Sequence, residues 1–422
     1  MGEDVTLPRL SRHLLLASAL EMARLANDAL SRAGLDEASI VGEVRRGVAV
    51  VSELSLVLRG PADVQRVARA LRHAAACEGV TVEGRDAVRM TFQGGGPARV
   101  RIVHRSRFVE ALLRGTGSPR HVRWLERLAQ GRGGLSWLCA QARSERDVYS
   151  ALDLPFAPPE LREGATPRIP PLVDSVSGVF HVHTTWSDGS ASVAEMALAA
   201  GKAGYAYLGI TEHSRAASYA RGLDAERLAA QAREVKKARR EVGGVAILHG
   251  VEVDVMPDGS LDLDDETLAS LDFVIASVHV GLEMEATAMT ERLVRAVSHP
   301  LVTILGHPTG RLLLGRAGYA FDVEAVATAA ARNDTFLEIN ANPQRLDLGE
   351  DDVRRAAACG ARFAIDPDAH TTRGIRDTPL GLSVARRAGL RREQVLNARA
   401  TDEVLAYLSA RRRAAKRRLA LA

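Results

Sequence analysis

The chain has 422 residues, 46% of them hydrophobic and 26% charged, a balance typical of globular proteins and not of disordered or fibrous ones. No apolar run reaches the roughly 18 residues of a membrane span and no signal peptide is recognisable, so we expect a soluble, cytoplasmic protein with no membrane partner. No obligate protein partner is evident either. The cysteines form no CxxC pair, which favours a reducing compartment: Cys77, Cys139 and Cys359.

Basic side chains are unevenly distributed along the chain. Residues 1–150 carry 23 basic and 16 acidic side chains, whereas residues 151–422 carry 33 and 36. This asymmetry suggests that the first part holds a polyanion, DNA, and that the second part processes it. The alternative is a composition that is simply rich in arginine.

The chain divides near residues 161–175, "LREGATPRIPPLVDS", where prolines gather without apolar periodicity. This composition is typical of an extended linker. We expect a linker over residues 166–175 and a second domain over residues 176–422. The part before the linker is expected to separate into residues 1–112, which begin with a helix, and residues 113–165.

After the linker, short apolar runs alternate with longer helical stretches such as 192–204 and 224–242. The runs have the length and composition of buried strands: 178–183, 207–211, 245–253, 273–279, 302–307, 336–340 and 362–366. Seven such β-α units predict an α/β domain whose parallel sheet closes, or nearly closes, as a barrel with helices outside.

Side chains that commonly bind metals end or follow six of these seven strands. His181 and His183 are two residues apart, so they share one face of their strand, and Asp368 and His370 repeat this spacing. The carboxyl ends of barrel strands are where barrel enzymes place their chemistry. We therefore expect nine side chains to converge on one mouth: His181, His183, Asp188, His213, Glu252, His279, His307, Asp368 and His370.

The residue types indicate metal chemistry. Imidazole suits zinc, manganese and iron, and carboxylates can bridge two ions. Six imidazoles and three carboxylates exceed what one ion uses, so the pattern predicts two or three divalent ions. Neighbouring ions can activate a hydroxide and stabilise in-line displacement at a phosphate. The other histidines are interpreted as ordinary structural residues: His13, His73, His104, His121, His249 and His299.

The motifs around these residues resemble a known family. They read "HVHTTWSDG", "TEHS", "GVEVD", "SVHVG", "GHPTGRLL", "LEINANPQRLDL" and "DPDAH". They are similar to the polymerase-and-histidinol-phosphatase (PHP) domain, in the variant found at the end of bacterial X-family DNA polymerases. The resemblance covers residues 176 to about 408 and implies a distorted seven-stranded β/α barrel with three manganese or zinc ions.

The resemblance also implies how the ligands are shared. A first ion would be held by His181, His183, Glu252 and Asp368. A second ion would share Glu252 and also bind His279 and His307. The third ion would be held by Asp188, His213 and His370. Glu212 departs from the family, which has aspartate there, and we expect it to support the ligands from behind.

Candidate catalytic residues are Glu252, Asp188, Arg311 and Arg345. A guanidinium fork fits phosphate oxygens, so the two arginines are candidates to clamp the substrate. Asn340 and Asn342, two apart after a strand, could face the same mouth. The alternative is that these are ordinary polar loop residues.

Residues 31–165 resemble the X-family polymerase more weakly. "VGEVRRGVAVVSELSLVL" follows its palm, and "FVEALLRGTGSPRHVRWLERLA" and "DVYSALDLPFAPPELREG" follow its thumb. The palm carboxylates that would hold two metal ions read Glu53, Ser55 and Arg99, and the turn serine reads Glu43. We therefore expect a small α+β remnant of palm and thumb that does not polymerise, with no lyase domain before it.

This remnant could still bind DNA through phosphate contacts. The candidate residues are Arg45, Arg46, Arg101, Arg105 and Arg107, with Arg114 and Arg120 as further candidates. The basic tail, residues 410–418, is expected to extend the last helix, with a solvated helix end as the alternative to phosphate contact. The alternative to DNA binding by the palm and thumb remnant is that it is only a structural relic.

The leading hypothesis is a metal-dependent phosphodiesterase, a 3′–5′ exonuclease that trims DNA ends in repair. The alternative is a phosphomonoesterase of the histidinol-phosphatase type, which uses the same centre in a narrower pocket. A DNA-binding scaffold with a structural metal centre is disfavoured because all nine ligands are present. Residual polymerase activity would contradict our interpretation of Glu53, Ser55 and Arg99.

Overall fold

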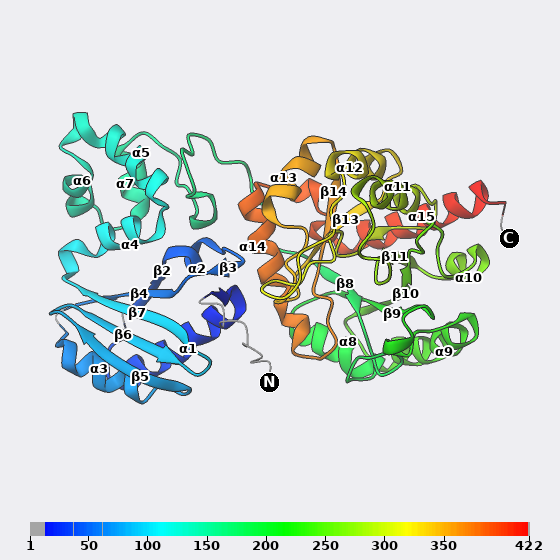
Figure 1. The fold of residues 1–422 in the computed structure, drawn as a ribbon, viewed down its shortest axis with the longest axis horizontal. Coiled ribbons are helices and arrows are strands. Elements are labelled where there is room, and N and C mark those ends of the chain that lie inside the picture. The colour runs from blue at the N-terminus through cyan, green and yellow to red at the C-terminus, as the bar shows by residue number, and fades with distance from the viewer. Residues whose placement is uncertain (1–12, 37, 61, 421–422) are drawn as a thin grey trace, which may run out of the picture. The chain divides into compact units, whose positions relative to one another are not determined.

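The structure is a computed structural model that describes residues 13–36, 38–60 and 62–420. Its internal contacts divide the chain into two units, Met1–Ile169 and Pro170–Ala422 (Figure 1). The division lies inside the proline-rich stretch that the sequence indicated as a linker. The expected boundary between residues 112 and 113 stays a prediction.

The first unit is built on a mixed five-stranded sheet in the order β2-β4-β7-β6-β5. Strand β7 alternates strictly: Ala98, Val100 and Ile102 are buried, while Arg99 and Arg101 are exposed. Such alternation is typical of a sheet with one packed and one open face. The elements are β1 (Leu14–Leu15), α1 (Leu16–Arg32), β2 (Ala38–Val41), α2 (Gly42–Arg46), β3 (Val50–Val51), β4 (Leu54–Arg59), α3 (Val64–Arg72), β5 (Cys77–Glu83), β6 (Ala87–Phe92) and β7 (Gly96–Val103).

A helical part follows the sheet in the first unit. Its four α-helices are α4 (Phe108–Thr116), α5 (Pro119–Ala129), α6 (Leu135–Gln141) and α7 (Glu145–Ala151). Leu113, Leu125 and Tyr149 are fully buried in the core that these helices share. Helix α7 begins with a capping box, in which Ser144 and Asp147 satisfy each other's backbone N–H groups.

The second unit contains the seven expected strands, all parallel, in the order β14-β13-β12-β11-β10-β9-β8 (Figure 1). They are β8 (Gly178–Val182), β9 (Tyr207–His213), β10 (Ala246–Asp254), β11 (Phe273–Ser277), β12 (Ile304–Leu305), β13 (Phe336–Asn340) and β14 (Arg362–Asp366). Ala369, just after β14, accepts from the His183 N–H and donates to the His181 carbonyl, at 2.9 and 3.1 Å. The sheet is thereby nearly closed into a barrel, as the sequence predicted.

Helices cover the outside of this barrel. They are α8 (Val193–Lys202), α9 (Ala225–Glu241), α10 (Asp265–Ser270), α11 (Ala286–Val297), α12 (Val323–Arg332), α13 (Glu350–Ala358), α14 (Thr378–Ala388) and α15 (Thr401–Arg418). Side-chain oxygens cap several of them, for example Asp224 at α9 and Asp322 at α12. Because helices enclose the sheet, the strands are buried on both faces and read as continuous apolar runs.

Strands β8 and β10 differ from their expected bounds by one residue, and β9, β11 and β12 differ by at least two. Strand β9 continues to His213, whereas β11 ends at Ser277, two residues before His279. Strand β12 is reduced to two residues. Gly306 packs so closely on Ser277 that a Cβ atom would lie 2.3 Å from its Oγ, and His307 has a φ of 24°, so the chain leaves the sheet there.

Candidate metal centre

All nine ligand-type side chains lie together at the carboxyl end of the barrel. His181, His213 and Glu252 are on strands β8, β9 and β10, and the other six follow the ends of β8, β11, β12 and β14. Four overlapping groups of their ligand atoms have all members within 4.8 Å of one another. The strand periodicity and the shared edge of a parallel sheet therefore place these residues as the sequence predicted.

Glu252 is the centre of this arrangement. Its carboxylate is fully buried and lies close to five histidine rings. Oε1 is 2.9, 3.3 and 3.3 Å from the Nε2 atoms of His307, His181 and His279, and Oε2 is 2.8 Å from Nδ1 of His213 and 3.6 Å from Nε2 of His183. One carboxylate that is shared by five imidazoles is well placed to bridge ions.

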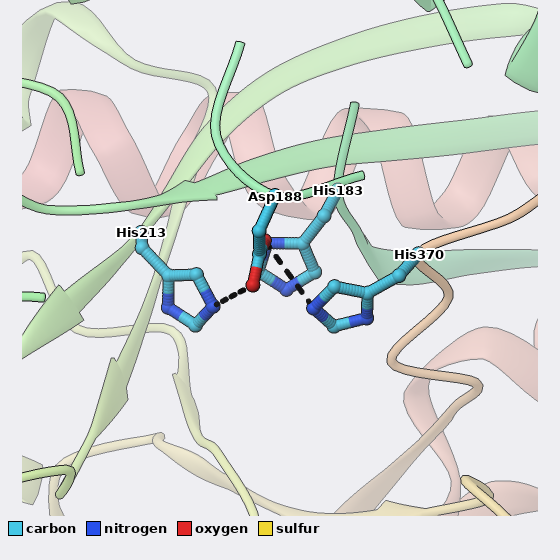
Figure 2. A group of neighbouring side chains, drawn as sticks. All are labelled: His183, Asp188, His213 and His370. Atoms are coloured by element: carbon cyan, nitrogen blue, oxygen red, sulfur yellow. Dashed lines mark ion pairs between the residues drawn. The ribbon is translucent and has the colours of Figure 1, made fainter. Parts of the chain in front are cut away.

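A second group surrounds Asp188 in the loop after β8. Figure 2 shows His183, His213 and His370 with their rings turned toward the Asp188 carboxylate. The carboxylate oxygens are 3.8 Å from His183 Nδ1, 3.6 Å from His213 Nε2 and 3.4 Å from His370 Nε2. His183 and His370 stack with ring centroids 4.2 Å apart. His183 therefore joins the three residues that the resemblance assigned to a third ion.

Asp368 connects the two groups. Its Oδ1 is 3.5 Å from the Nε2 atoms of both His181 and His183, and 3.7 Å from Nδ1 of His370. The residue has a φ of 49°, in the left-handed region that a non-glycine residue rarely adopts. Such local conformations are typical of functional sites, where the surrounding structure holds them.

The donor set fits divalent metal ions. Buried ring nitrogens of His181, His183 and His307 have no hydrogen-bond partner. Buried polar groups are normally hydrogen-bonded, so atoms left open here need another partner. Imidazole nitrogens and carboxylate oxygens are ligands for zinc, manganese and iron.

The electrostatics of the cluster separate the histidines into two kinds. Burial and the neighbouring His370 and His213 lower the pKa of His183 to about 3, so its ring stays neutral. Burial also acts on His213 and His279, but Glu252, with Asp188 or Asp254, outweighs it and raises their pKa values to about 10 and about 9. A cation in the cluster would take the place of those protons.

Two buried carboxylates behind the cluster were missed by the sequence reasoning. Glu338 accepts from Nδ1 of His181 at 2.6 Å and from the backbone N–H of His307 at 2.6 Å. Asp254 lies 3.1 Å from Nδ1 of His279. A carboxylate on the far nitrogen fixes the tautomer and orientation of a ligating histidine. The available signal was a charged residue inside an otherwise apolar strand, in "FLEIN" and "GVEVD".

Glu212 supports the loop after β8 and is not among the clustered ligand atoms. It accepts from the N–H and Oγ1 of Thr184, from Oγ of Ser187 and from Nε2 of Gln231. Gln231 in turn contacts the ring of His249 at 3.0 Å. Thr184 and Ser187 flank the turn that leads to Asp188, so this network positions the Asp188 loop.

The two candidate arginines behave differently. Nε of Arg345 is 3.3 Å from Asp368, which places its guanidinium beside the cluster. Arg311 instead donates to the carbonyls of Arg345 and Leu346, so it holds the loop that carries Arg345. Asn340 donates to Asp368 at 3.1 Å and to Glu338 at 3.0 Å. The side chain of Asn342 accepts from the N–H of Gln344 within its own loop.

Tyr219 is a further residue at the rim that no motif indicated. Its ring is 70% exposed and lies 6.1 Å from the His213 ring, centroid to centroid. Aromatic residues make up only 4% of the chain, so an exposed one beside the centre is notable. Such a ring can stack on a nucleobase.

The histidines that the sequence set aside lie apart from the clustered ligand atoms. His249 contacts Gln231, and His299 lies 3.1 Å from Asp265. His121 lies between the Gly164 carbonyl and the Tyr149 hydroxyl, and His104 contacts Ser106. Each of these four has a structural partner.

In the first unit, the residues at the palm positions form an open pocket of about 260 Å³. Ser55 pairs with Arg99 across β4 and β7, and Ser55 Oγ is 3.3 Å from Glu53. Arg99 and Arg101 line this pocket, and Nε of Arg99 contacts Glu83 at 3.0 Å. Glu43 accepts from Ser52. The arrangement places the Arg99 guanidinium in the same pocket as Glu53 and Ser55.

Several candidate DNA contacts are occupied within the first unit. Arg45 pairs with Glu145, and Arg46 with Glu163 and the Thr116 carbonyl. Arg114 pairs with Glu110 and Glu126. Arg107 remains 72% exposed beside Glu110.

The basic tail lies on α15, as expected, but its first arginines are not solvated. Arg411 donates to the carbonyls of Val302, Asn333 and Asp334, and Arg412 donates to Leu271 and Asp272. These guanidinium groups bind carbonyls that end helices or begin strands. They anchor the last helix to the barrel.

Comparisons with known proteins agree with this geometry. Residues 180–342 match the family model described as the PHP domain. The chain is 35% identical over 92% of its length to a DNA polymerase/3′-5′ exonuclease PolX of Bacillus subtilis (strain 168), of which it covers 72%. It is 32% identical over half its length to a probable phosphatase of Thermoanaerobacter sp. (strain X514), of which it covers 91%. A probable phosphatase of Shewanella halifaxensis is 29% identical over 41% of the chain.

Across the described part of the chain, no helix combines the length and the apolar character needed to cross a bilayer.

Proposed function

The chain belongs to the family of PHP-domain phosphoesterases that includes bacterial PolX, and on that premise we propose that it is a 3′–5′ exonuclease that trims DNA ends. Its hydrolysis of phosphate esters depends on metal, as in the family. The observation that carries the proposal is the convergence of nine ligand-type side chains on one barrel mouth. A role in DNA repair is part of the same proposal.

The extent of similarity favours a nuclease over a small-molecule phosphatase. The relative named as a polymerase and exonuclease matches 92% of the chain, including the first unit. The probable phosphatases match half of the chain or less. A chain that acted only on small monoesters would have no evident use for a first unit that resembles a polymerase.

The ligand residues and the residues around them have distinct roles in this proposal. His181, His183, Glu252 and Asp368 would hold ions between the two groups, and Asp188, His213, His279, His307 and His370 would complete their coordination. The ions, manganese, zinc or iron and two or three in number, supply a nucleophile and charge stabilisation when bound. Glu338 and Asp254 keep His181 and His279 in the ligating orientation.

The side chains at the rim bind the substrate. The Arg345 guanidinium, beside Asp368, is placed to donate hydrogen bonds to phosphate oxygens and to offset the charge that develops on them. Arg311 positions Arg345 through the loop carbonyls. The exposed Tyr219 ring supports a base next to the scissile phosphate.

The first unit binds DNA but does not polymerise in this proposal. Two-metal nucleotidyl transfer needs carboxylates for both ions, and Glu53 stands there with Ser55 and Arg99. Arg101, Arg105 and Arg107 are exposed and remain candidates for phosphate contact, whereas Arg45 and Arg46 are less exposed and engaged with glutamates. A primer-extension assay that adds nucleotides would contradict this part.

A phosphomonoesterase is the second candidate. It is supported by the probable phosphatases, because the chain covers 91% of one of them with the same barrel. Such an enzyme would use the same residues and differ only in the substrate that reaches the mouth.

The decisive experiment incubates the purified full chain with Mn²⁺ and a 5′-labelled oligonucleotide. Stepwise shortening from the 3′ end is expected, and Glu252→Gln, which keeps the side-chain shape, should lose it. Rapid cleavage of simple phosphomonoesters without shortening of the oligonucleotide would favour the phosphatase. A matched control is Glu324→Gln on the exposed surface of α12.

A further inference from the structure

A groove of about 660 Å³ opens next to the metal centre, on the outside of the second unit. One wall is helix α8, which contributes Leu198 and Lys202. The other wall is the segment after β14, with Thr372, Arg373 and Arg376. Arg376 lies in the short 3-10 helix Gly374–Asp377 that leads into α14. None of the nine ligand-type residues of the metal centre lines this groove.

The groove begins at the rim of the mouth. Ser190 lines it two residues beyond Asp188, and Thr372 lines it two residues beyond His370. The two rims are joined, because the N–H and Oγ of Ser190 donate to the His370 carbonyl at 2.8 and 3.1 Å. A chain-like molecule with one end at the Asp188 group can therefore continue into the groove without crossing the barrel.

The groove is positively charged. Lys202, Arg373 and Arg376 are all exposed. Glu195 is the one carboxylate that lines it, and its Oε2 accepts from Ser192 at the start of α8, at 2.7 and 2.8 Å. The negative charge is thus held at the helix end, where it offsets the helix dipole.

These cations differ from most arginines of the second unit. Arg292, Arg311, Arg411 and Arg412 donate to backbone carbonyls and hold loops in place. The side chains of Lys202 and Arg376 form no hydrogen bond or ion pair with another described residue, and Arg373 interacts electrostatically with Asp377. Cations that are not used for folding are available for a ligand.

The length of the groove and the exposed apolar side chain in its α8 wall suit a nucleic acid strand. Helix α8 has 10 residues and is about 15 Å long, whereas phosphates follow one another about every 3.4 Å along the axis of one B-DNA strand. Several phosphates can therefore lie along the groove. Leu198, which is 50% exposed, offers an apolar surface to a sugar or a base.

We propose that this groove binds the backbone of the DNA strand whose 3′ end lies in the mouth, and that it selects polynucleotides over small phosphomonoesters. The inference rests on the proposed exonuclease function and identifies where its substrate continues. The phosphates 5′ to the scissile bond lie against Lys202, Arg373 and Arg376. A small monoester reaches the mouth but not the groove.

The test compares two triple variants of the full, metal-loaded chain. The groove variant is Lys202→Gln/Arg373→Gln/Arg376→Gln. The control, Arg233→Gln/Lys236→Gln/Arg240→Gln, removes the same charge from exposed positions of α9. Each protein is assayed for kcat/KM on a single-stranded oligonucleotide and on p-nitrophenyl phosphate, over a range of salt concentrations.

The groove variant should lower the ratio of oligonucleotide to monoester kcat/KM by at least about tenfold, mainly through KM, since each lost phosphate contact weakens binding. Its log–log salt dependence should be shallower by about 2, because each single-strand phosphate contact contributes about 0.7. The control variant should match the wild type in both. An equal loss in groove and control variants, or an unchanged ratio, would overturn the proposal.

Failure of the groove proposal can be separated from failure of the nuclease proposal. If the wild type cleaves only the monoester, fluorescence anisotropy with a labelled oligonucleotide replaces the rate assay. Equal affinity of wild type and groove variant then overturns the groove, and weaker binding by the groove variant supports it. If the triple variant does not fold by circular dichroism, Lys202→Gln and Arg376→Gln are tested singly by the same criteria.

Discussion

The two units of this chain treat their buried charges in opposite ways. In the first unit, the buried Glu145 accepts from Arg45 and Arg162, and Arg162 also donates to the Ala157 carbonyl. In the second unit, His181, His183 and His307 are equally buried, yet each keeps a ring nitrogen without a hydrogen-bond partner. One Arg162 nitrogen is left open in the first network, whereas several open atoms gather in one cluster of the second unit. Paired charges stabilise a fold, and a cluster of open buried atoms indicates that something else binds there.

The two units also differ in whether their basic side chains are available to bind a ligand. The sequence places Arg45 and Arg46 in a polymerase-like turn and so makes them candidates for DNA contact. The structure engages both with glutamates of the same unit. Lys202 and Arg376, which the sequence did not single out, are exposed beside the mouth. Charge in the sequence therefore does not by itself indicate a binding surface.

The largest effect should come from opening the metal centre. His183→Ala removes a ring that lies within reach of Glu252, Asp188 and Asp368. We expect exonuclease activity to fall at least about a thousandfold, since bound ions supply several kcal/mol of transition-state stabilisation. Bound metal, measured by elemental analysis, should fall with it. As a control, Arg99→Ala in the first unit should leave the exonuclease rate and the metal content unchanged. If Arg99→Ala lost as much activity and metal as His183→Ala, the two units would not differ in the way described above.

The next effect concerns the buried ion pair of Glu145 and Arg162 in the first unit. Glu145→Ala leaves Arg162, which is fully buried, without its carboxylate partner. Breaking a buried pair from one side costs about 3 kcal/mol or more in free energy of unfolding. In a Trp186→Phe background the remaining tryptophans, Trp124 and Trp137, report the first unit alone, so denaturant titration by fluorescence isolates its transition.

The control for this variant is Glu126→Ala, which breaks a more exposed pair with Arg114. Its cost should stay below about 1 kcal/mol. Equal destabilisation by both variants would show that the Glu145 network does not carry the stability assigned to it.

A smaller effect is expected from the carboxylate behind His181. Glu338→Gln keeps the side-chain volume but weakens its hold on Nδ1 of His181. Metal affinity should fall about 10- to 100-fold, as for other supporting carboxylates of metal sites. Titration of the metal-free protein followed by calorimetry measures this, and excess metal should restore the exonuclease rate. A variant with unchanged affinity would limit Glu338 to a packing role.

The smallest effect is a pH dependence of the first unit. Burial lowers the pKa of His121 below its usual 6.5, against an opposing contribution from the Gly164 carbonyl. The folded unit then binds a proton less readily than the unfolded chain, so its stability is present above pH 6.5 and declines as the pH falls below it. Denaturation midpoints of the Trp186→Phe protein between pH 7.5 and 5 should show this decline. It should be weaker in His121→Asn, and identical slopes would exclude His121 as its source.

Much of the fold and of the centre follows from local patterns. All seven strands of the barrel were expected from apolar runs, although β12 is shorter than its run. The spacing of His181 and His183 predicts a shared face because strands have a period of two. His279 and His307 were expected at strand ends, and the structure has them just beyond, where the chain has already left the sheet.

Other parts of the site depend on pairings between distant segments. Arg311 and Arg345 occupy similar motifs, yet only Arg345 reaches Asp368, while Arg311 binds loop carbonyls. Glu338 was not singled out from the motif that contains it, and it matters through its contact with His181, 157 positions away. The groove requires α8 and the segment after β14 to lie side by side, which no local pattern indicates.

The sequence by itself determined the barrel and the residue types of its centre, because periodicity and composition are local properties of the chain. Tertiary structure alone decided which buried groups pair with one another and which remain open, and which exposed cations lie beside the mouth. The physical reason is that a charge has no assigned partner until folding brings distant segments within a few ångströms, where desolvation and Coulomb attraction select one arrangement.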